Sequence, residues 1–518
     1  MNIGSEMQEI SSNNKRIAKN TLLLYFRMLV TMAVSLYTSR VVLNILGVED
    51  FGIYNVVGGI VAMFGFINGS MTSATQRYLT FELGQNNRTQ LTKVFSTSLS
   101  IHAIISFLII VLAETVGLWF LWNKMQIPAD RMNAAFWVFQ CSVAASVIMI
   151  MSVPYNAAII AHEKMSAFAY ISIIEVSLKL LIVYFLQYFH VDKLILYAVL
   201  IVIVQFIIRL CYSWYCNRHF KETKYRWIWD KTLFCEMTGF AGWNLFGNLA
   251  AITFTQGLNL LLNMFFGPVV NAARGIAVQA QTAIGQFSSN FQTALNPQIT
   301  KSYATGDREY MHSLIFRSAK FSFFLLLFLS LPILIETKAI LTLWLKIVPD
   351  HTVVFLRIML CTTWVYAISN PLITAASATG KIKLYQSVVG GLLLLILPIS
   401  YLCLRLGLPA YSVFIVHLGM EITAQFARLW MLRRMIRLSL REYFTKVIWR
   451  ISKVTIIALA APLAVAYWLP GEGIWNLLTI CLICAISTSM SVYWFGLTSG
   501  EKIYISSRVS SIVSKFRK

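Results

Sequence analysis

Long apolar runs alternate with short polar clusters along most of this chain. A bilayer core of ~30 Å needs about 20 helical residues to cross it, and the apolar runs have this length. We therefore predict an all-α polytopic membrane protein with about fourteen transmembrane helices. The expected spans are residues 20–46, 52–74, 94–122, 133–160, 166–189, 193–216, 234–265, 268–295, 313–342, 352–378, 384–406, 409–432, 447–469 and 473–497.

The composition supports the membrane class and defines the orientation. Hydrophobic residues make up 58% of the 518 residues and charged residues 12%, against about 45–50% and 25% in soluble domains. A net charge of +22 suggests nucleic acid, but most Lys and Arg residues lie on alternate connections between spans and not on one soluble face. This alternation is the positive-inside pattern. It argues against a nucleic-acid partner and predicts that both termini are cytoplasmic.

Three short features recur at a spacing close to 220 residues, each at the end of an expected span or in the turn that follows. The pairs are Gly47 and Gly267, Gly84 and Gly306, and Pro154 and Pro371, at offsets of 220, 222 and 217. Chance similarity between two apolar stretches is the alternative, because Gly and Pro are common in membrane helices. Three features in the same order favour two related six-span halves, with a repeat axis along the membrane normal and two additional C-terminal spans.

This repeat gives the expected organisation of the chain. The two six-span lobes are residues 20–216 and 234–432, and the additional spans are residues 447–497. The remaining segments are an N-terminal tail without a secretory signal, a basic linker, a basic loop and a basic C-terminal tail, all expected in the cytoplasm; they are residues 1–19, 217–233, 433–446 and 498–518.

Charged residues inside the spans are the candidates for function, because each costs about 2.5–3.5 kcal/mol to insert and usually faces a cavity or a partner. Basic residues outnumber acidic ones, which predicts an interior suited to an anion. The basic residues are Arg27, Arg40, Lys179, Arg209, Arg274, Arg357 and Arg428, and the acidic ones are Glu114, Glu175 and Glu421.

Four arginines are candidate contacts for an anionic substrate. Arg27 and Arg274 each lie about two turns inside a span, too deep for easy snorkelling. The span that contains Arg274 is also rich in amides, so we expect it to face water or substrate. Arg40 and Arg357 lie nearer the outer surface, where snorkelling and an outer vestibule are both open interpretations.

Two acidic groups are candidates for ion coupling. Glu175 and Lys179 are four residues apart, so they share a helix face as a structural ion pair or as a site for a coupling ion such as H⁺ or Na⁺. Glu421 shares a face with Gln425 and Arg428 in the same way. The sequence has no metal-binding spacing, phosphate loop or nucleophile motif, so we predict no metal, no cofactor and no catalytic residue.

Several motifs resemble a known family. Residues 39–59, Ser-Arg-Val-Val-Leu-Asn-Ile-Leu-Gly-Val-Glu-Asp-Phe-Gly-Ile-Tyr-Asn-Val-Val-Gly-Gly, resemble the first two helices of the Wzx-type O-antigen flippases. These belong to the MATE-like multidrug/oligosaccharidyl-lipid/polysaccharide exporter superfamily. Residues 273–277 and 296–301, Ala-Arg-Gly-Ile-Ala and Asn-Pro-Gln-Ile-Thr-Lys, resemble the equivalent stretch of the second half. The resemblance runs through the twelfth span.

The resemblance implies a function as well as a fold. It implies two pseudo-symmetric lobes around a central cavity, working by alternating access in the bacterial plasma membrane. The implied substrate is an undecaprenyl-pyrophosphate-linked oligosaccharide, moved from the inner to the outer leaflet for surface polysaccharide or lipopolysaccharide synthesis. Arginines in the first and eighth helices would engage the pyrophosphate, and Arg27 and Arg274 match these positions, with Arg40 as a third candidate.

Other functions remain as alternatives. A cation-coupled multidrug antiporter of the MATE type shares the fold, but drug exporters tend to have an acid in the first helix, and residues 20–46 contain no Asp or Glu. A membrane enzyme or a scaffold in glycan assembly is the third alternative, and the short outer connections argue against an enzyme. Expected partners are the lipid-linked oligosaccharide, membrane lipids and the glycan polymerase or glycosyltransferase machinery.

Overall fold

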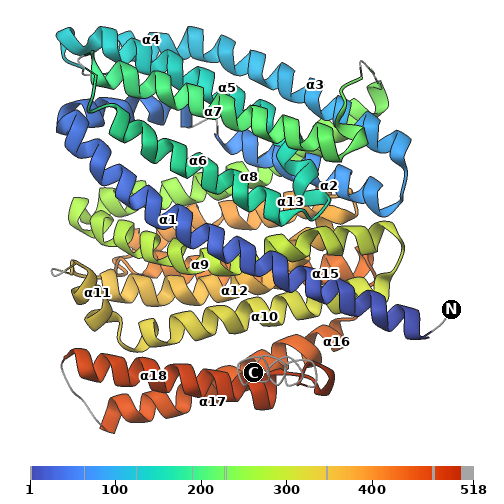
Figure 1. Ribbon diagram of the computed structural model, residues 1–518. Helices are drawn as coiled ribbons and strands as arrows, with labels where there is room; N and C mark the ends of the chain where they lie inside the picture. The colour runs from blue at the N-terminus through green and yellow to red at the C-terminus, as the bar shows by residue number, and fades with distance from the viewer. Residues whose placement is uncertain are drawn as a thin grey trace, which may run out of the picture. The chain divides into compact units, whose positions relative to one another are not determined.

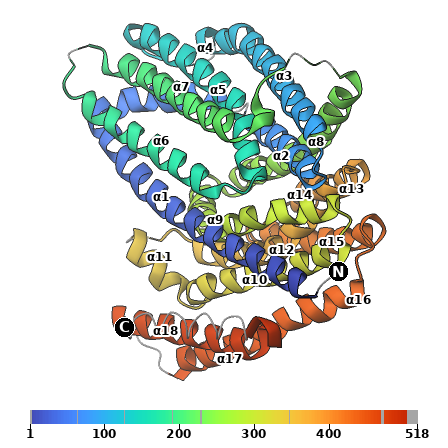
Figure 2. The same cartoon turned by 45° about the vertical axis from the view of Figure 1, so that its right-hand side comes forward.

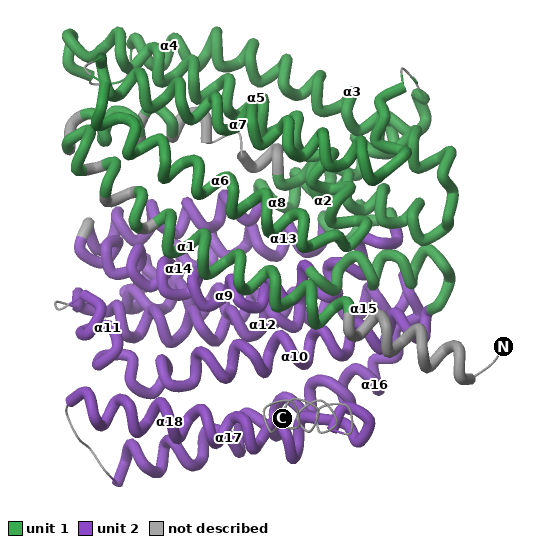
Figure 3. Tube along the Cα trace, in the orientation of Figure 1, with its two compact units in different colours: residues 1–249, 294–307, 380–386 green, residues 250–293, 308–379, 387–518 purple. Residues whose placement is uncertain are grey.

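The computed structural model describes residues 3–502 apart from residues 63–64, 124, 126, 190, 227, 229, 346–347 and 469–472. For residues 3–15, 36, 39–40, 43, 48–49, 55–56, 59–62, 65–68 and 268 it describes the backbone only. Every regular element in this part of the chain is a helix (Figure 1). Contacts divide the chain into two compact units, coloured separately in Figure 3. Unit 1 contains residues 1–249, 294–307 and 380–386, and unit 2 contains residues 250–293, 308–379 and 387–518.

The helices of unit 1 follow the apolar runs of the first half of the chain. They are α1 (Ile3–Ala62), α2 (Gly65–Gly84), α3 (Arg88–Leu112), α4 (Leu118–Asn123), α5 (Met132–Ala161), α6 (Met165–Phe185), α7 (Lys193–His219) and the first part of α8 (Lys231–Phe266). A π-helical turn, Ala113–Gly117, joins α3 to α4. Helix α5 packs against α7, and the two run side by side in both views (Figure 1, Figure 2).

Unit 2 contains the rest of α8 and the later helices, except residues 294–304 of α9 and 383–386 of α13, which belong to unit 1. The later helices are α9 (Pro268–Ala304), α10 (Arg308–Ile335), α11 (Thr337–Leu345), α12 (Thr352–Ala378), α13 (Lys383–Leu394), α14 (Ile396–Arg405), α15 (Ser412–Met435), α16 (Leu440–Tyr443), α17 (Trp449–Trp468) and α18 (Ile474–Ser491). Helices α13 and α14 replace one predicted span and are separated at Leu395. Pro398 explains the break, because it has no N–H to donate to the carbonyl four residues earlier.

Eleven helical segments of the described residues are long and apolar enough to cross a membrane. The prediction of an all-helical polytopic protein is therefore confirmed, and the count of fourteen spans stays a prediction. Three predicted spans, 52–74, 268–295 and 409–432, have no counterpart among the eleven. Helix α9 is nevertheless continuous over residues 268–295, and α15 covers residues 412–432 of the last span. The amides of α9 and the charged residues of α15 lower the hydropathy of these two helices. Span 52–74 contains residues outside the described part of the chain.

Left-handed backbone conformations recur with the spacing on which the predicted repeat depends. Gly47 has φ 79° and interrupts the helical geometry of α1, at the predicted end of the first span. Gly267 has φ 77° between α8 and α9, 220 residues later. Two more pairs of left-handed residues lie at similar offsets: Asn86 with Gly306, and Glu163 with Gly380. The lobe limits 20–216 and 234–432 are not the limits of the two units and stay a prediction.

Each unit has its own apolar core. In unit 1, Phe95 and Phe139 are fully buried, and the Phe95 ring meets the edge of the Tyr155 ring at 5.2 Å between centroids. In unit 2, the rings of Phe355 and Phe414 lie 4.6 Å apart and join α12 to α15. These aromatic contacts fix the helices that position the charged side chains described next.

Candidate functional site

Arg27 lies in unit 1, where α1 packs against α6 and α7. Its guanidinium lies over the Phe168 ring of α6, 4.4 Å from the ring centroid, a cation–π contact that stabilises a positive charge away from water. Within the part of the chain that the structure describes, the buried Arg27 Nε has no hydrogen-bond partner, and no carboxylate forms an ion pair with this side chain. Glu175 and Tyr212 are close enough to act on it electrostatically. Arg27 therefore has capacity to bind an additional acceptor.

The predicted pair Glu175 and Lys179 lies on α6 in the same neighbourhood. Lys179 Nζ donates to Glu175 Oε1 at 2.6 Å, and Gln205 Nε2 of α7 donates to the same oxygen at 3.2 Å. Both members of the pair are partly exposed, 33% for the Lys179 side chain and 26% for that of Glu175. The structural ion pair is thus present, and ion coupling at Glu175 or Lys179 stays a prediction.

Arg274 lies in unit 2, on α9, and only 8% of it is exposed. Its Nη1 donates to Asn259 Oδ1 at 3.1 Å and its Nη2 donates to the Thr255 carbonyl oxygen at 2.8 Å, both on α8. The third donor, Nε, is buried and has no hydrogen-bond partner among the described residues. No described carboxylate forms an ion pair with this guanidinium. Among the residues that the structure describes, Arg274 is therefore a buried cation that bonds to neutral groups, an arrangement that favours binding of an anion.

The amides of α9 divide between two faces. Gln281 Nε2 donates to Thr363 Oγ1 at 2.8 Å, and the buried Gln292 donates to the Ala367 carbonyl at 2.8 Å, so these two amides bind α12 inside unit 2. On another face a polar row is exposed, and its spacing of three or four residues keeps it in line. The row contains Gln279, Thr282, Gln286 and Ser289. A lipid-facing helix would not present such a row, so this face of α9 is suited to water or to a hydroxyl-rich ligand.

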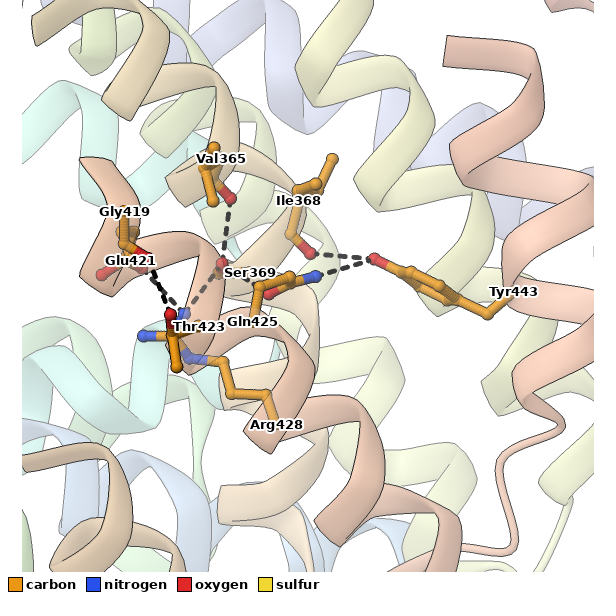
Figure 4. Close-up of polar contacts among 9 residues, drawn as sticks. All are labelled: Val365, Ile368, Ser369, Gly419, Glu421, Thr423, Gln425, Arg428 and Tyr443. Atoms are coloured by element: carbon orange, nitrogen blue, oxygen red, sulfur yellow. Dashed lines mark hydrogen bonds and ion pairs between the residues drawn. The ribbon is translucent and has the colours of Figure 1, made fainter. Parts of the chain in front are cut away.

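Glu421 belongs to a closed network in unit 2 (Figure 4). Arg428 Nη1 donates to Glu421 Oε1 at 2.8 Å and to Ser369 Oγ at 3.0 Å, and all three residues are buried. Ser369 Oγ in turn donates to Gln425 Oε1 at 2.7 Å, and Gln425 continues to the Tyr443 hydroxyl at 3.4 Å. Such an arrangement is typical of a structural ion pair that joins α12 and α15 to Tyr443.

The two remaining predicted contacts differ from Arg27 and Arg274. Arg357 Nε donates to Thr337 Oγ1 at 3.0 Å and its Nη2 donates to the Ile335 carbonyl at 3.2 Å, so the side chain caps the last turn of α10. The Arg40 side chain lies outside the described residues. Sequence patterns did not indicate Gln205 or Ser369 as partners, because each bonds across helices. No group of three His, Cys, Asp or Glu among the described residues is suited to hold a metal ion.

Comparisons with known proteins identify a family and a fold for this chain. The model of the polysaccharide biosynthesis protein family matches residues 17–303, and no curated protein matches the chain at a significant level. A crystal structure of MATE in the bent conformation is similar, with a TM-score of 0.72 at 11% identity, over 82% of this chain and 96% of that one.

Two further solved structures share the fold, each over 82% of this chain and 96% of its own chain. The outward-facing conformation of a multidrug resistance MATE family transporter of the MOP superfamily gives a TM-score of 0.71 at 12% identity. A MOP superfamily transporter from Pyrococcus furiosus, described as having a binding pocket of reverse polarity, gives 0.68 at 14%. The prediction of a transporter and not an enzyme agrees with this fold. Since the family model covers more than half of its residues, this chain belongs to the polysaccharide biosynthesis protein family, and its fold is that of the MATE transporters.

Proposed function

We propose that this protein is a flippase that moves an undecaprenyl-pyrophosphate-linked oligosaccharide from the inner to the outer leaflet of the bacterial plasma membrane. The observation that carries the proposal is Arg274, a buried guanidinium whose hydrogen-bond partners among the described residues are Asn259 and a backbone carbonyl. A diphosphate offers oxygens in the geometry that a guanidinium binds, and its transfer through an apolar slab without such a partner is prohibitive.

Arg27 supplies a second cation of the same kind. Its aromatic contact with Phe168 leaves the hydrogen-bonding edge of the guanidinium for a ligand. The acid-free segment 20–46 that contains it differs from the first helix expected of a drug exporter. This difference favours an anionic lipid over an organic cation, and the multidrug antiporter is the weaker alternative.

The exposed polar row of α9 is suited to the oligosaccharide part of the proposed substrate. Gln279, Thr282, Gln286 and Ser289 offer amides and hydroxyls but no charge, and sugar hydroxyl groups pair with such donors and acceptors. The row lies on the same helix as Arg274. A single helix would thus contact both the diphosphate and the oligosaccharide.

We propose fourteen spans, arranged as two six-helix lobes around a central cavity with two additional C-terminal helices, and both termini in the cytoplasm. We also propose that H⁺ or Na⁺ coupling, if it uses a residue named above, uses Glu175 and not Glu421, because Glu421 is enclosed with Arg428. Glycan polymerase and glycosyltransferases are the expected protein partners.

Export of surface glycan in a flippase-deficient host tests the proposal. Loss of a charged hydrogen-bonding contact costs about 1.5–3 kcal/mol, so Arg274→Ala should lower export at least tenfold while lipid-linked oligosaccharide accumulates inside. Arg274→Lys should retain only part of the wild-type export, because an ammonium cannot reproduce the forked hydrogen-bonding geometry of the guanidinium. Arg405→Ala, an exposed arginine at the end of α14, is the matched control. Wild-type export by Arg274→Ala at equal expression would contradict the proposed site.

A further inference from the structure

Glu163, in the turn between α5 and α6, is a buried carboxylate with partners on two other chain segments, α1 and the end of α9. Arg16 Nε and Lys301 Nζ lie 2.8 and 2.6 Å from its two carboxylate oxygens, and Gln298 Nε2 donates to Oε2 at 2.7 Å. Its backbone oxygen accepts from Asn20 Nδ2 at 3.2 Å. We call Arg16, Asn20, Glu163, Gln298 and Lys301 the Glu163 cluster. All five lie in unit 1.

The cluster depends on the charge of Glu163. Only 1% of this side chain is exposed, and a buried carboxylate is tolerated only when cations and donors surround it. Arg16 and Asn20 come from α1, and Gln298 and Lys301 come from the end of α9. Without the carboxylate, the N-terminal part of α1 and the end of α9 would present two cations to the same turn with nothing between them. Glu163 is therefore the residue that holds both segments on the α5–α6 turn.

The backbone at Glu163 is unfavourable for a glutamate. The residue has φ 58° and lies two residues after Ala161, the last residue of α5. Its N–H donates to the Ile160 carbonyl, and the N–H of Lys164 donates to the Ile159 carbonyl. This is a Schellman motif, whose left-handed position is usually glycine. A side chain there costs about 1–2 kcal/mol. Gly380 occupies the left-handed position 217 residues later, in the turn between α12 and α13, with φ 76°. At Glu163 the chain has a strained residue where glycine would be easier, which indicates that the carboxylate is used.

A close backbone contact lies beside the cluster. A Cβ on Gly84, at the end of α2, would lie 2.8 Å from the Ala304 Cβ and 3.1 Å from the Lys301 carbonyl oxygen. The end of α9 is thus held by the hydrogen bond from Gln298, by the ion pair of Lys301 and by close packing at Ala304. The helices held in this way, α1 and α9, are those that carry Arg27 and Arg274.

We propose that Glu163 is a gating residue, whose ion pairs hold the N-terminal part of α1 and the end of α9 closed at the predicted cytoplasmic side and must break in each transport cycle. The transport part of this proposal rests on the proposed flippase function. Arg27 lies on α1 and Arg274 lies on α9, the two helices that the cluster contacts. Movement of either helix during transport would therefore strain the ion pairs of the cluster. Two ion pairs on one carboxylate give a closure that is stable and that opens as a unit.

Hydrogen–deuterium exchange of the full-length protein tests the closure without any substrate. In Glu163→Gln, we expect backbone exchange to rise severalfold at the end of α9 and to stay unchanged in α12. In Glu163→Gly, exchange should rise equally at the end of α9 but not in the α5–α6 turn, because glycine suits the left-handed position. Glu309→Gln, an exposed acid in the first turn of α10, is the matched control. Wild-type exchange at the α9 end in both Glu163 variants would overturn the proposal.

Glycan export tests the part in the transport cycle. We expect Glu163→Gln and Glu163→Gly to lower export at least fivefold and the exchanged pair Glu163→Lys with Lys301→Glu to recover part of it. Faster exchange with wild-type export would show a structural tie only and would overturn the gating role. If Glu163→Gln does not accumulate, Glu163→Gly and the exchanged pair carry the test. If the cargo is not a lipid-linked oligosaccharide, export fails as a readout for Arg274 as well, whereas the exchange result stands.

Discussion

Arg131 and Asp192 form an ion pair in unit 1, with Arg131 Nη1 2.7 Å from Asp192 Oδ2. The same guanidinium donates from Nε to Asp50 Oδ1 at 2.8 Å. Asp192 also caps α7, because its other oxygen accepts from the backbone N–H groups of Leu194 and Ile195. One arginine thus ties α1 and the start of α5 to the start of α7.

Substitutions of Asp192 should separate the ion pair from the helix cap. Asp192→Asn retains an oxygen for the cap and loses the charge, so we expect about 1 kcal/mol of destabilisation. Asp192→Ala loses both and should cost a further ~1 kcal/mol. The apparent melting temperature of the purified protein in detergent should therefore fall in the order wild type, Asp192→Asn, Asp192→Ala. Equal melting of the two variants would mean that the cap contributes nothing.

The contact between α2 and α9 predicts a size-dependent effect. Gly84→Ala would bring its Cβ within 2.8 Å of the Ala304 Cβ, and overpacking of this kind costs about 1–3 kcal/mol. Ala304→Gly in the same chain removes one of the clashing atoms and should restore part of the stability. A Cβ on Gly242 of α8 meets nothing within 4 Å, so Gly242→Ala is the matched control. If Gly84→Ala melts like Gly242→Ala, the helices are not in close contact.

Hydropathy predicts the helices well because the membrane allows few alternatives to a helix. The expected span 352–378 is α12, Thr352–Ala378, and the span 133–160 is α5, Met132–Ala161. Features that leave the hydropathy unchanged were not predicted. The π-helical turn Ala113–Gly117, for example, lies inside an apolar run. The chain does leave helical geometry at Gly47, where the first span was predicted to end.

The sequence indicates candidate site residues only where a charge stands in an apolar run. Arg27 and Arg274 were selected as candidates in this way, and the i, i+4 spacing of Glu175 and Lys179 predicted the contact between them. Ser369 lies 59 residues from Arg428 in sequence, so no local pattern pairs them. Glu163 stands beside Lys164 in a short polar turn and has the sequence signature of a solvated charge. Its burial depends on α1 and α9, which reach the turn only in the folded chain.

Glu501 gives a pH-dependent prediction. Burial would raise the pKa of this carboxyl, but the hydrogen bond from Lys320 and bonds from Thr498 outweigh burial and lower the pKa. A carboxyl with a lowered folded-state pKa contributes stability above its unfolded pKa of about 4.3, and this contribution is lost as the pH falls through the folded value. Glu501→Gln should therefore melt below wild type at pH 7 and approach it below about pH 4.3. A difference that is constant with pH would assign the effect to packing.

The Glu421–Arg428 pair should behave as a structural unit and not as a coupling site. Either neutral substitution leaves one charge buried, since 4% of Glu421 and 2% of Arg428 are exposed, and breaking such a pair costs about 3–5 kcal/mol. We expect Glu421→Gln and Arg428→Gln each to lower the melting temperature strongly. The double variant, which leaves no buried charge and keeps amides near Ser369, should recover most of the loss. Melting of the wild type, the two single variants and the double variant forms a double-mutant cycle, which gives the coupling free energy between the two side chains. If Glu421 instead couples an ion, the double variant will be stable but will have lost the dependence of export on the H⁺ or Na⁺ gradient.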